Sequence, residues 1–155
     1  MDVEALIAGV GELLRLPALR LNEQGVCRLA VDNDLIVDIE HDGAANVLHI
    51  YSSLGPLPAG GREAVYEALL AGNLFGAETG GGALAVDLAA KEIVLCRSLS
   101  PKGLEPSDLV AVIEAHVAAV EHWRGQVAGL SAGAGASALP PDRVDGFPQV
   151  GGIRA

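Results

Sequence analysis

The sequence predicts an α+β domain in which three helices accompany an antiparallel sheet, with the elements in the order α-β-β-β-α-β-β-α. Apolar residues recur at helical spacing in three separate segments, and five shorter segments alternate between apolar and polar residues. The strand-like segments come in consecutive runs, which favours antiparallel pairing over the strand–helix–strand units of a parallel sheet. The chain has 155 residues, 50% of them hydrophobic, and is therefore long enough to bury a core of its own.

The first predicted helix lies near the N-terminus. Asp2 is a favourable N-cap because its carboxylate can accept a hydrogen bond from a backbone N–H group in the first turn. Pro17 ends the helical pattern, since proline cannot continue a helix. The apolar stripe of this helix consists of Val3, Leu6, Ile7, Val10, Leu13 and Leu14.

Three strands are predicted to follow the first helix. Residues 27–31 and 35–40 alternate between apolar and polar side chains, and the polar turn at 32–34 joins them into a hairpin. Residues 47–54 are rich in β-branched and aromatic residues, which are typical of strands, and Gly55-Pro56 ends this third strand. The three segments together predict an antiparallel meander.

A second helix, a second hairpin and a third helix complete the predicted domain. Residues 62–73 have helical spacing, and their alanines would let another helix approach closely. Residues 83–86 and 92–99 predict the hairpin, and Pro106 suits the first turn of the third helix. The apolar stripe of that helix consists of Leu109, Val112, Ile113, Val117 and Val120.

The composition of the chain changes beyond Arg124. Glycine, serine, alanine and proline become frequent, and no periodic pattern remains that could bury one face of a helix or strand. The sequence therefore predicts a folded domain at residues 1–127 and a flexible C-terminal tail at residues 128–155.

Charge and hydropathy limit the partners of the protein. The formal net charge of −10 repels nucleic-acid phosphates, and the basic residues do not cluster, so we expect no nucleic-acid partner. The first residues are acidic where a secretory signal is basic, and no apolar run approaches the roughly 18 residues of a membrane span. We therefore expect a cytosolic protein that does not insert into membranes.

The sequence contains no motif that predicts an enzyme. The glycine-rich stretch at 76–82 comes after a predicted helix and before a predicted strand, whereas a phosphate-binding loop leads from a strand into a helix. These glycines therefore predict a turn. Cys27 and Cys96 have no partner at metal-ligand spacing and are expected to be reduced thiols. With no catalytic motif elsewhere in the sequence, we expect no catalytic residue and no cofactor.

Carboxylates and histidines could in principle form a metal or acid–base site. Asp38 and Glu40 share one face of their strand while His41 faces the other way, which is the ordinary pattern of a strand with one solvated face. His116 and His122 lie six positions apart, not at the four-residue spacing of helical metal ligands. We therefore expect no metal site and assign both histidines to the surface of the third helix.

The order of elements and several stretches resemble one known family. The similarity covers roughly residues 2–125 and is carried by residues 13–21 with Gly25 and Cys27, residues 34–40, residues 67–75 with the glycines up to Gly82, then Leu84, Val86 and Asp87, and finally Trp123-Arg124. In these features the chain resembles the class I type III secretion chaperones of the Tir-chaperone (CesT-like) family. That resemblance implies a homodimer of the bacterial cytoplasm that binds the N-terminal segment of a secreted effector. It also implies that the segment stays extended, that the complex is presented to the export ATPase, and that no reaction is catalysed.

The resemblance also implies two sets of contact residues. An extended effector segment could add a strand to an open sheet edge while its side chains occupy apolar grooves. The implied effector-binding residues are Leu14, Leu16, Leu19, Leu21, Leu29 and Val31. The implied dimer interface consists of Val65, Leu69, Leu70, Leu84 and Val86, all of which are equally suited to the core of one protomer.

Two alternative functions are compatible with the same residues. A protein of this fold could sequester an activator or a second chaperone in a regulatory circuit, and only the identity of its partner separates this from effector escort. A small-ligand-binding α+β domain that uses the glycine stretch or the carboxylates is the other alternative. The few aromatic residues, Tyr51, Tyr66 and Trp123, are expected in the core in preference to a partner interface.

Overall fold

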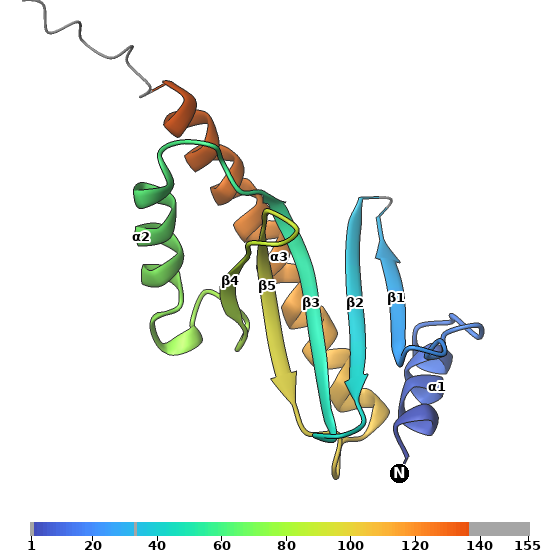
Figure 1. The fold of residues 1–155 in the computed structure, drawn as a ribbon. Coiled ribbons are helices and arrows are strands. Elements are labelled where there is room, and N and C mark those ends of the chain that lie inside the picture. Colours follow the sequence, from blue (N-terminus) through green and yellow to red (C-terminus); the bar gives the residue numbers. More distant parts are fainter. Residues whose placement is uncertain (1, 33, 137–155) are drawn as a thin grey trace, which may run out of the picture.

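A computed structural model describes residues 2–32 and 34–136, and it confirms the predicted order of helices and strands (Figure 1). One short 3-10 helix, η1, is added after the second helix. The elements are α1 (Val3–Leu13), β1 (Val26–Val31), β2 (Leu35–Asp42), β3 (Val47–Pro56), α2 (Arg62–Gly72), η1 (Leu74–Gly76), β4 (Ala83–Asp87), β5 (Glu92–Leu99) and α3 (Pro106–Ala136).

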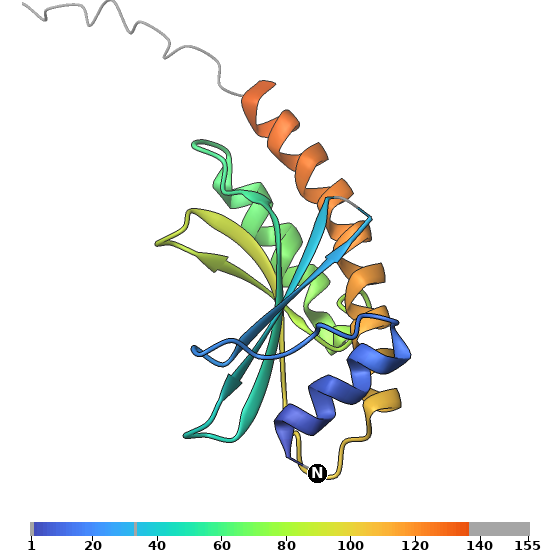
Figure 2. The ribbon, with the colours of Figure 1, turned by 90° about the vertical axis from the view of Figure 1, so that its right-hand side faces the viewer.

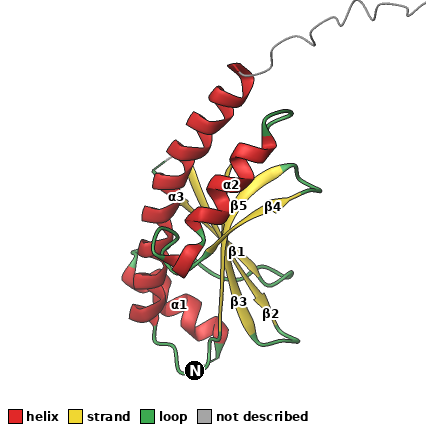
Figure 3. Ribbon diagram, turned by 90° about the vertical axis from the view of Figure 1, so that its left-hand side faces the viewer, coloured by secondary structure: helices red, strands yellow, loops and turns green. Residues whose placement is uncertain are grey.

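The five strands form one antiparallel sheet in the order β1-β2-β3-β5-β4, so that β1 and β4 are its two edges. Figures 2 and 3 show that the described helices lie on one side of the sheet and that none of them covers the other. The sheet therefore has a covered inner face and a bare outer face.

The core lies between the inner face of the sheet and the helices. The strands contribute every second residue, as the alternating pattern predicts, and each fully buried aliphatic side chain stabilises the fold by about 1.5–3 kcal/mol. The core includes Val37, Ile39, Ile50, Ile93 and Leu95 from the sheet, Leu6, Ile7 and Val10 from α1, and Leu109, Ile113 and Val120 from α3.

Two local features fix the helices in place. The predicted N-cap of α1 is confirmed, since the backbone N–H of Glu4 donates to Asp2 Oδ1 at 2.9 Å. Gly72 lies directly against the ring of Trp123, and a Cβ atom at this position would overlap that ring. The Trp123 indole N–H also donates to the carbonyl of Glu78 at 2.9 Å, so this buried aromatic ties α3 to the segment after α2.

The third helix is longer than its composition predicts. It continues to Ala136, so that the predicted boundary between residues 127 and 128 falls inside α3. Val127 is buried and Leu130 packs against the core, which supports the helix through a glycine-rich stretch that lacks helical periodicity. The remainder of the predicted tail, residues 137–155, lies outside the described residues.

Candidate functional site: an apolar groove beside an edge strand

A groove of about 540 Å³ runs between the segment that follows α1, the end of β1 and the middle of α3. Its apolar walls are formed by Leu14 and Leu16 after α1, Leu29 and Val31 of β1, and Ile113 and Val117 of α3. Its rim carries three carboxylates, those of Asp32, Glu114 and Glu121. The groove therefore combines an apolar interior with an acidic border.

Gly11 allows the chain to form this groove. The backbone N–H of Leu16 donates to the Gly11 carbonyl at 2.7 Å, so the chain folds back against the helix it has just left. A Cβ atom at position 11 would lie only 2.7 Å from the Leu16 carbonyl oxygen. Arg15, between the two, adopts a left-handed conformation with φ of 58°. This reversal places Leu16 opposite β1 instead of continuing along the axis of α1.

Four of the six predicted effector-binding residues meet in the groove, namely Leu14, Leu16, Leu29 and Val31. Leu19 and Leu21 do not line it. Both are half-buried and pack against the core, and Leu21 borders a separate, polar recess beside His41 and Lys102.

Sequence reasoning missed the α3 wall of the groove. Ile113 and Val117 lie on the apolar stripe that the periodicity identifies, but that stripe predicts only burial. In the structure the same stripe is buried in the core at Leu109, Ile113 and Val120, and Ile113 also lines the groove together with the half-buried Val117. No sequence signal distinguishes these two environments.

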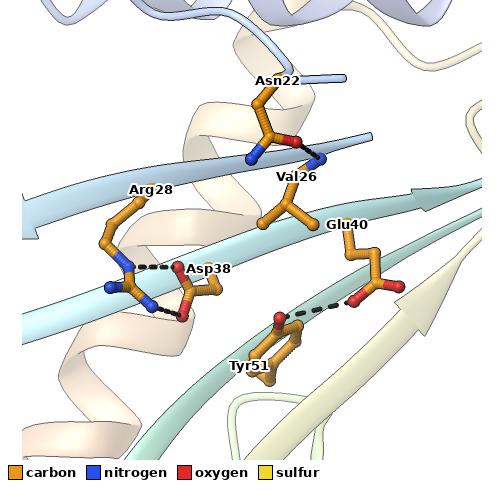
Figure 4. A network of polar contacts seen from close by, with 6 residues as sticks. All are labelled: Asn22, Val26, Arg28, Asp38, Glu40 and Tyr51. Carbon is orange, nitrogen blue, oxygen red and sulfur yellow. Dashed lines mark hydrogen bonds and ion pairs between the residues drawn. The ribbon is translucent and has the colours of Figure 1, made fainter. Parts of the chain in front are cut away.

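The edge strand β1 carries an ion pair on the bare face of the sheet. Arg28 donates to both carboxylate oxygens of Asp38 on β2, at 2.7 and 2.8 Å, and Tyr51 on β3 donates to Glu40 at 3.4 Å (Figure 4). The hydrogen bond to Asp38 raises the pKa of Arg28, and burial raises the pKa of Tyr51. The bare face is therefore polar next to β1, where the inner face is apolar.

This arrangement corrects two expectations. Asp38 was expected to be a solvated carboxylate, but Arg28 covers it and leaves it only 8% exposed. Tyr51 was expected in the core, but it pairs with Asp38 across the strands and is half-buried on the bare face. Trp123 is buried, as predicted.

The predicted dimer residues fall into two groups. Val65, Leu69 and Leu84 are buried in the core of the protomer. Val86 is half-buried, and only Leu70 is strongly exposed, at 71%.

Two further exposed residues follow α2 closely. Leu74 and Phe75 are 64% and 94% exposed, and Phe75 has a left-handed backbone with φ of 58°. Such a conformation is unfavourable for a bulky residue, and nothing in the hydrophobic pattern had singled out this aromatic. Leu70, Leu74 and Phe75 together form what we call the α2 patch.

Comparison with known proteins decides the family. The sequence profile of the Tir chaperone protein (CesT) family matches residues 5–124. The chain belongs to this family. Among curated proteins, no sequence matches it.

Several solved structures share the CesT-family fold. A chain of the HopA1–SchA chaperone–effector complex superposes with a TM-score of 0.68 at 20% identity, covering 79% of this chain and 93% of that one. A chain of the ExsC–ExsE complex gives a TM-score of 0.68 at 18% identity, covering 81% and 96%. The Yersinia pestis type III secretion chaperone SycH, solved with a fragment of YscM2, gives 0.63 at 20% identity, covering 79% and 99%. At these identities the similarity establishes the fold.

The described part of this CesT-family chain contains no group of three or more histidine, cysteine or acidic side chains arranged to hold a metal ion. None of the described helices is long and apolar enough to cross a membrane. The glycine-rich stretch forms a turn, as predicted, in which Gly80 and Gly81 have positive φ and Gly80 approaches the Ala115 carbonyl of α3.

Two titratable side chains of this family member, His116 and Cys27, are buried and have shifted pKa values. His116 was expected on the helix surface, but it is only 1% exposed, with Nε2 3.0 Å from Ser52 Oγ of β3. Burial lowers the pKa of His116 from 6.5 to about 4, and the positive charge of Arg97 acts in the same direction. Burial, and secondarily the charge of Asp38, raises the pKa of Cys27 to about 11, so this thiol is protonated at neutral pH.

Proposed function

We propose that this CesT-family protein is a type III secretion chaperone of the bacterial cytoplasm. It binds the extended N-terminal segment of a secreted effector, keeps that segment competent for secretion and presents it to the export ATPase. The observation that carries the proposal is the apolar groove directly beside the edge strand β1. The similarity to a chain of the HopA1–SchA chaperone–effector complex supports it.

The groove and the edge suit an extended peptide. A strand added to β1 would form backbone hydrogen bonds with any sequence, and every second side chain would point to the inner face. Side chains opposite Leu29 and Val31 would enter the groove, so the client segment carries apolar residues at alternate positions. The carboxylates at the rim favour a basic residue next to them.

The α2 patch is the proposed contact with a second copy of the chain. Exposed aliphatic and aromatic side chains that adjoin one another on a soluble protein commonly mark an interface. The helix α2 contacts β4, the sheet edge opposite to β1 and its groove (Figure 1). A symmetric dimer through this patch would leave both grooves open.

The proposed function requires binding and no chemical step. The protein then acts by holding one segment of its partner in an extended state. If the partner were an activator or a second chaperone, the same groove would serve a regulatory role, so the identity of the captured partner separates these two functions.

A matched pair of variants tests the proposal. Val117→Asp places a charge in the groove, whereas Leu88→Asp places it on an exposed turn between β4 and β5. Tagged versions of both are recovered from the native bacterium under secretion-inducing conditions, and co-purifying proteins are identified and subjected to limited proteolysis. The wild type and Leu88→Asp should retain a secreted protein whose N-terminal segment is protected, and Val117→Asp should lose it. Equal capture by the two variants would refute the groove as the binding site.

A further inference from the structure

The first position of β1 already has a hydrogen-bonding partner in the free protein. Asn22, in the loop before β1, donates its backbone N–H to the carbonyl of Val26 at 2.8 Å. Its side-chain oxygen accepts from the Val26 N–H at 3.0 Å (Figure 4) and from the Gln24 N–H at 2.9 Å. Asn22 thus occupies both backbone groups of Val26, as a residue of a neighbouring strand would.

The direction of those bonds identifies the free backbone groups of β1. In an antiparallel pair, alternate residues point their N–H and C=O groups toward the partner strand and away from it. Val26 points away from β2, since it bonds to Asn22, and its neighbour Gly25 accepts from His41 of β2. With the same period, Arg28 and Ala30 also point away from β2, and among the described residues neither backbone bonds to a loop or helix on that side.

The groove coincides with the open part of this edge. Residues 29–32 line it, whereas Val26 does not. The blocked position and the groove therefore lie toward opposite ends of β1. The blocked position results from the backbone pairing of Asn22, and the position of the groove results from the packing of α1 and α3. Two independent features thus indicate the same end of β1 as the open one.

We propose that Asn22 is a register-setting residue for the client strand. The inference rests on the proposed function. By occupying Val26, Asn22 ends the open edge, so that an added strand pairs only with Arg28 and Ala30. The client is thereby held at the end of β1 where its inward side chains meet the groove. A strand shifted by one residue would direct those side chains to the bare, polar face, because side chains alternate between the two faces.

The test uses peptides selected on the wild-type protein from a display library of random short sequences. The selected peptides are first tested on Val117→Asp, and those that no longer bind are taken as peptides that bind in the groove. The selected peptide is then lengthened by two residues, at either end separately, and the dissociation constants are measured for wild type, Asn22→Ala and Asn22→Asp. Amide hydrogen exchange of Val26, Arg28 and Ala30 is followed by NMR with and without the peptide.

Peptide binding should protect the amides of Arg28 and Ala30 in all three proteins. The extra residues should leave the dissociation constant unchanged in wild type and in Asn22→Asp, because both proteins have a side-chain oxygen that accepts from the Val26 N–H. Asn22→Ala frees the Val26 N–H, while the bond from the backbone N–H of residue 22 to the Val26 carbonyl stays. One of the two extensions should therefore tighten binding about five-fold, the effect of one additional backbone hydrogen bond at the Val26 N–H. The Val26 amide should then exchange rapidly in the free variant and become protected in the complex.

Two outcomes would overturn the inference, and they are distinguishable. If groove-dependent peptides bind but the extension has the same effect in wild type and Asn22→Ala, Asn22 merely closes a turn and the proposed function stands. If no selected peptide is sensitive to Val117→Asp, the groove does not bind extended segments and both proposals fail.

Discussion

The two edges of the sheet differ in shape and chemistry although they belong to the same five strands. The β1 edge borders a groove with apolar walls, an acidic rim and free backbone groups at Arg28 and Ala30. The β4 edge lies near α2, where Leu70, Leu74 and Phe75 project from the surface. A groove beside free backbone groups is suited to bind an extended chain, whereas exposed apolar side chains are suited to pack against the surface of a folded partner. The two proposed contacts, with a client and with a second copy of the chain, therefore lie at opposite edges of one sheet.

The largest expected effect comes from two adjacent leucines near the β4 edge. Leu69 is 4% exposed and Leu70 is 71% exposed. Leu69→Asp buries an unpaired charge and should destabilise the protomer by more than about 4 kcal/mol. Leu70→Asp should leave the free energy of unfolding nearly unchanged and disrupt the proposed dimer, so that only monomers remain. Urea unfolding and light scattering measure the two effects, and a stable dimeric Leu70→Asp would exclude the α2 patch as the interface.

The second prediction concerns His116, which contacts Ser52 on β3, the central strand of the sheet. His116 has a pKa of about 4 in the folded protein against 6.5 when unfolded, so the unfolded chain binds more protons between these values. Stability from this group is complete above about pH 6.5 and is lost as the pH falls toward 4, by about 3 kcal/mol in total. His116→Gln, which can still contact Ser52, should flatten this part of the profile. Identical profiles of the two proteins in urea unfolding would contradict the assignment.

A third, smaller effect should distinguish the β1 edge from the β4 edge. Gly11→Ala would push against the Leu16 carbonyl and displace one wall of the groove. We expect a loss of about 1–3 kcal/mol in stability, as for other overpacked sites. Client or peptide affinity should decrease while the mass in light scattering stays that of the wild type. If affinity were unchanged, the fold-back of the chain at Leu16 would have no role in binding.

The smallest effect is expected at Gly129, which belongs to neither the groove nor the α2 patch, and it has the opposite direction. A Cβ atom at Gly129 would meet nothing within 4 Å. Gly129→Ala in the interior of α3 should therefore stabilise the protein by about 0.5–1 kcal/mol. Thermal unfolding measures this gain, and destabilisation would indicate that another chain lies close to this face of α3. Client binding and the mass in light scattering should stay as in the wild type.

The sequence predicts the elements of this fold well because each carries its own periodic signal. Alternation at residues 27–31 and 35–40 marks the β1–β2 hairpin, and Asp2 marks the start of α1. The end of α3 was missed because its support comes from Val127, whose burial depends on contacts far away in the sequence.

The site was only partly predictable, for a related reason. Periodicity identifies an apolar face but does not tell what covers it. Leu69 and Leu70 are neighbours of the same type, and only the orientation of α2 against β4 and α3 separates a core residue from an exposed one. Likewise, His116 and its partner Ser52 lie 64 positions apart, so no local pattern could show that this histidine is internal.

The walls of the groove come from segments far apart in the sequence, and this determines when the groove can form during synthesis. The β1–β2–β3 meander can form as soon as those strands have left the ribosome, because its pairing is local in sequence. The groove joins residues just after α1 to the middle of α3, which is translated last among the described elements. A nascent chain therefore has no groove until α3 has emerged, and its own apolar segment after α1 remains uncovered during translation. On the proposed function, the protein can bind an extended segment only after its own synthesis is nearly complete.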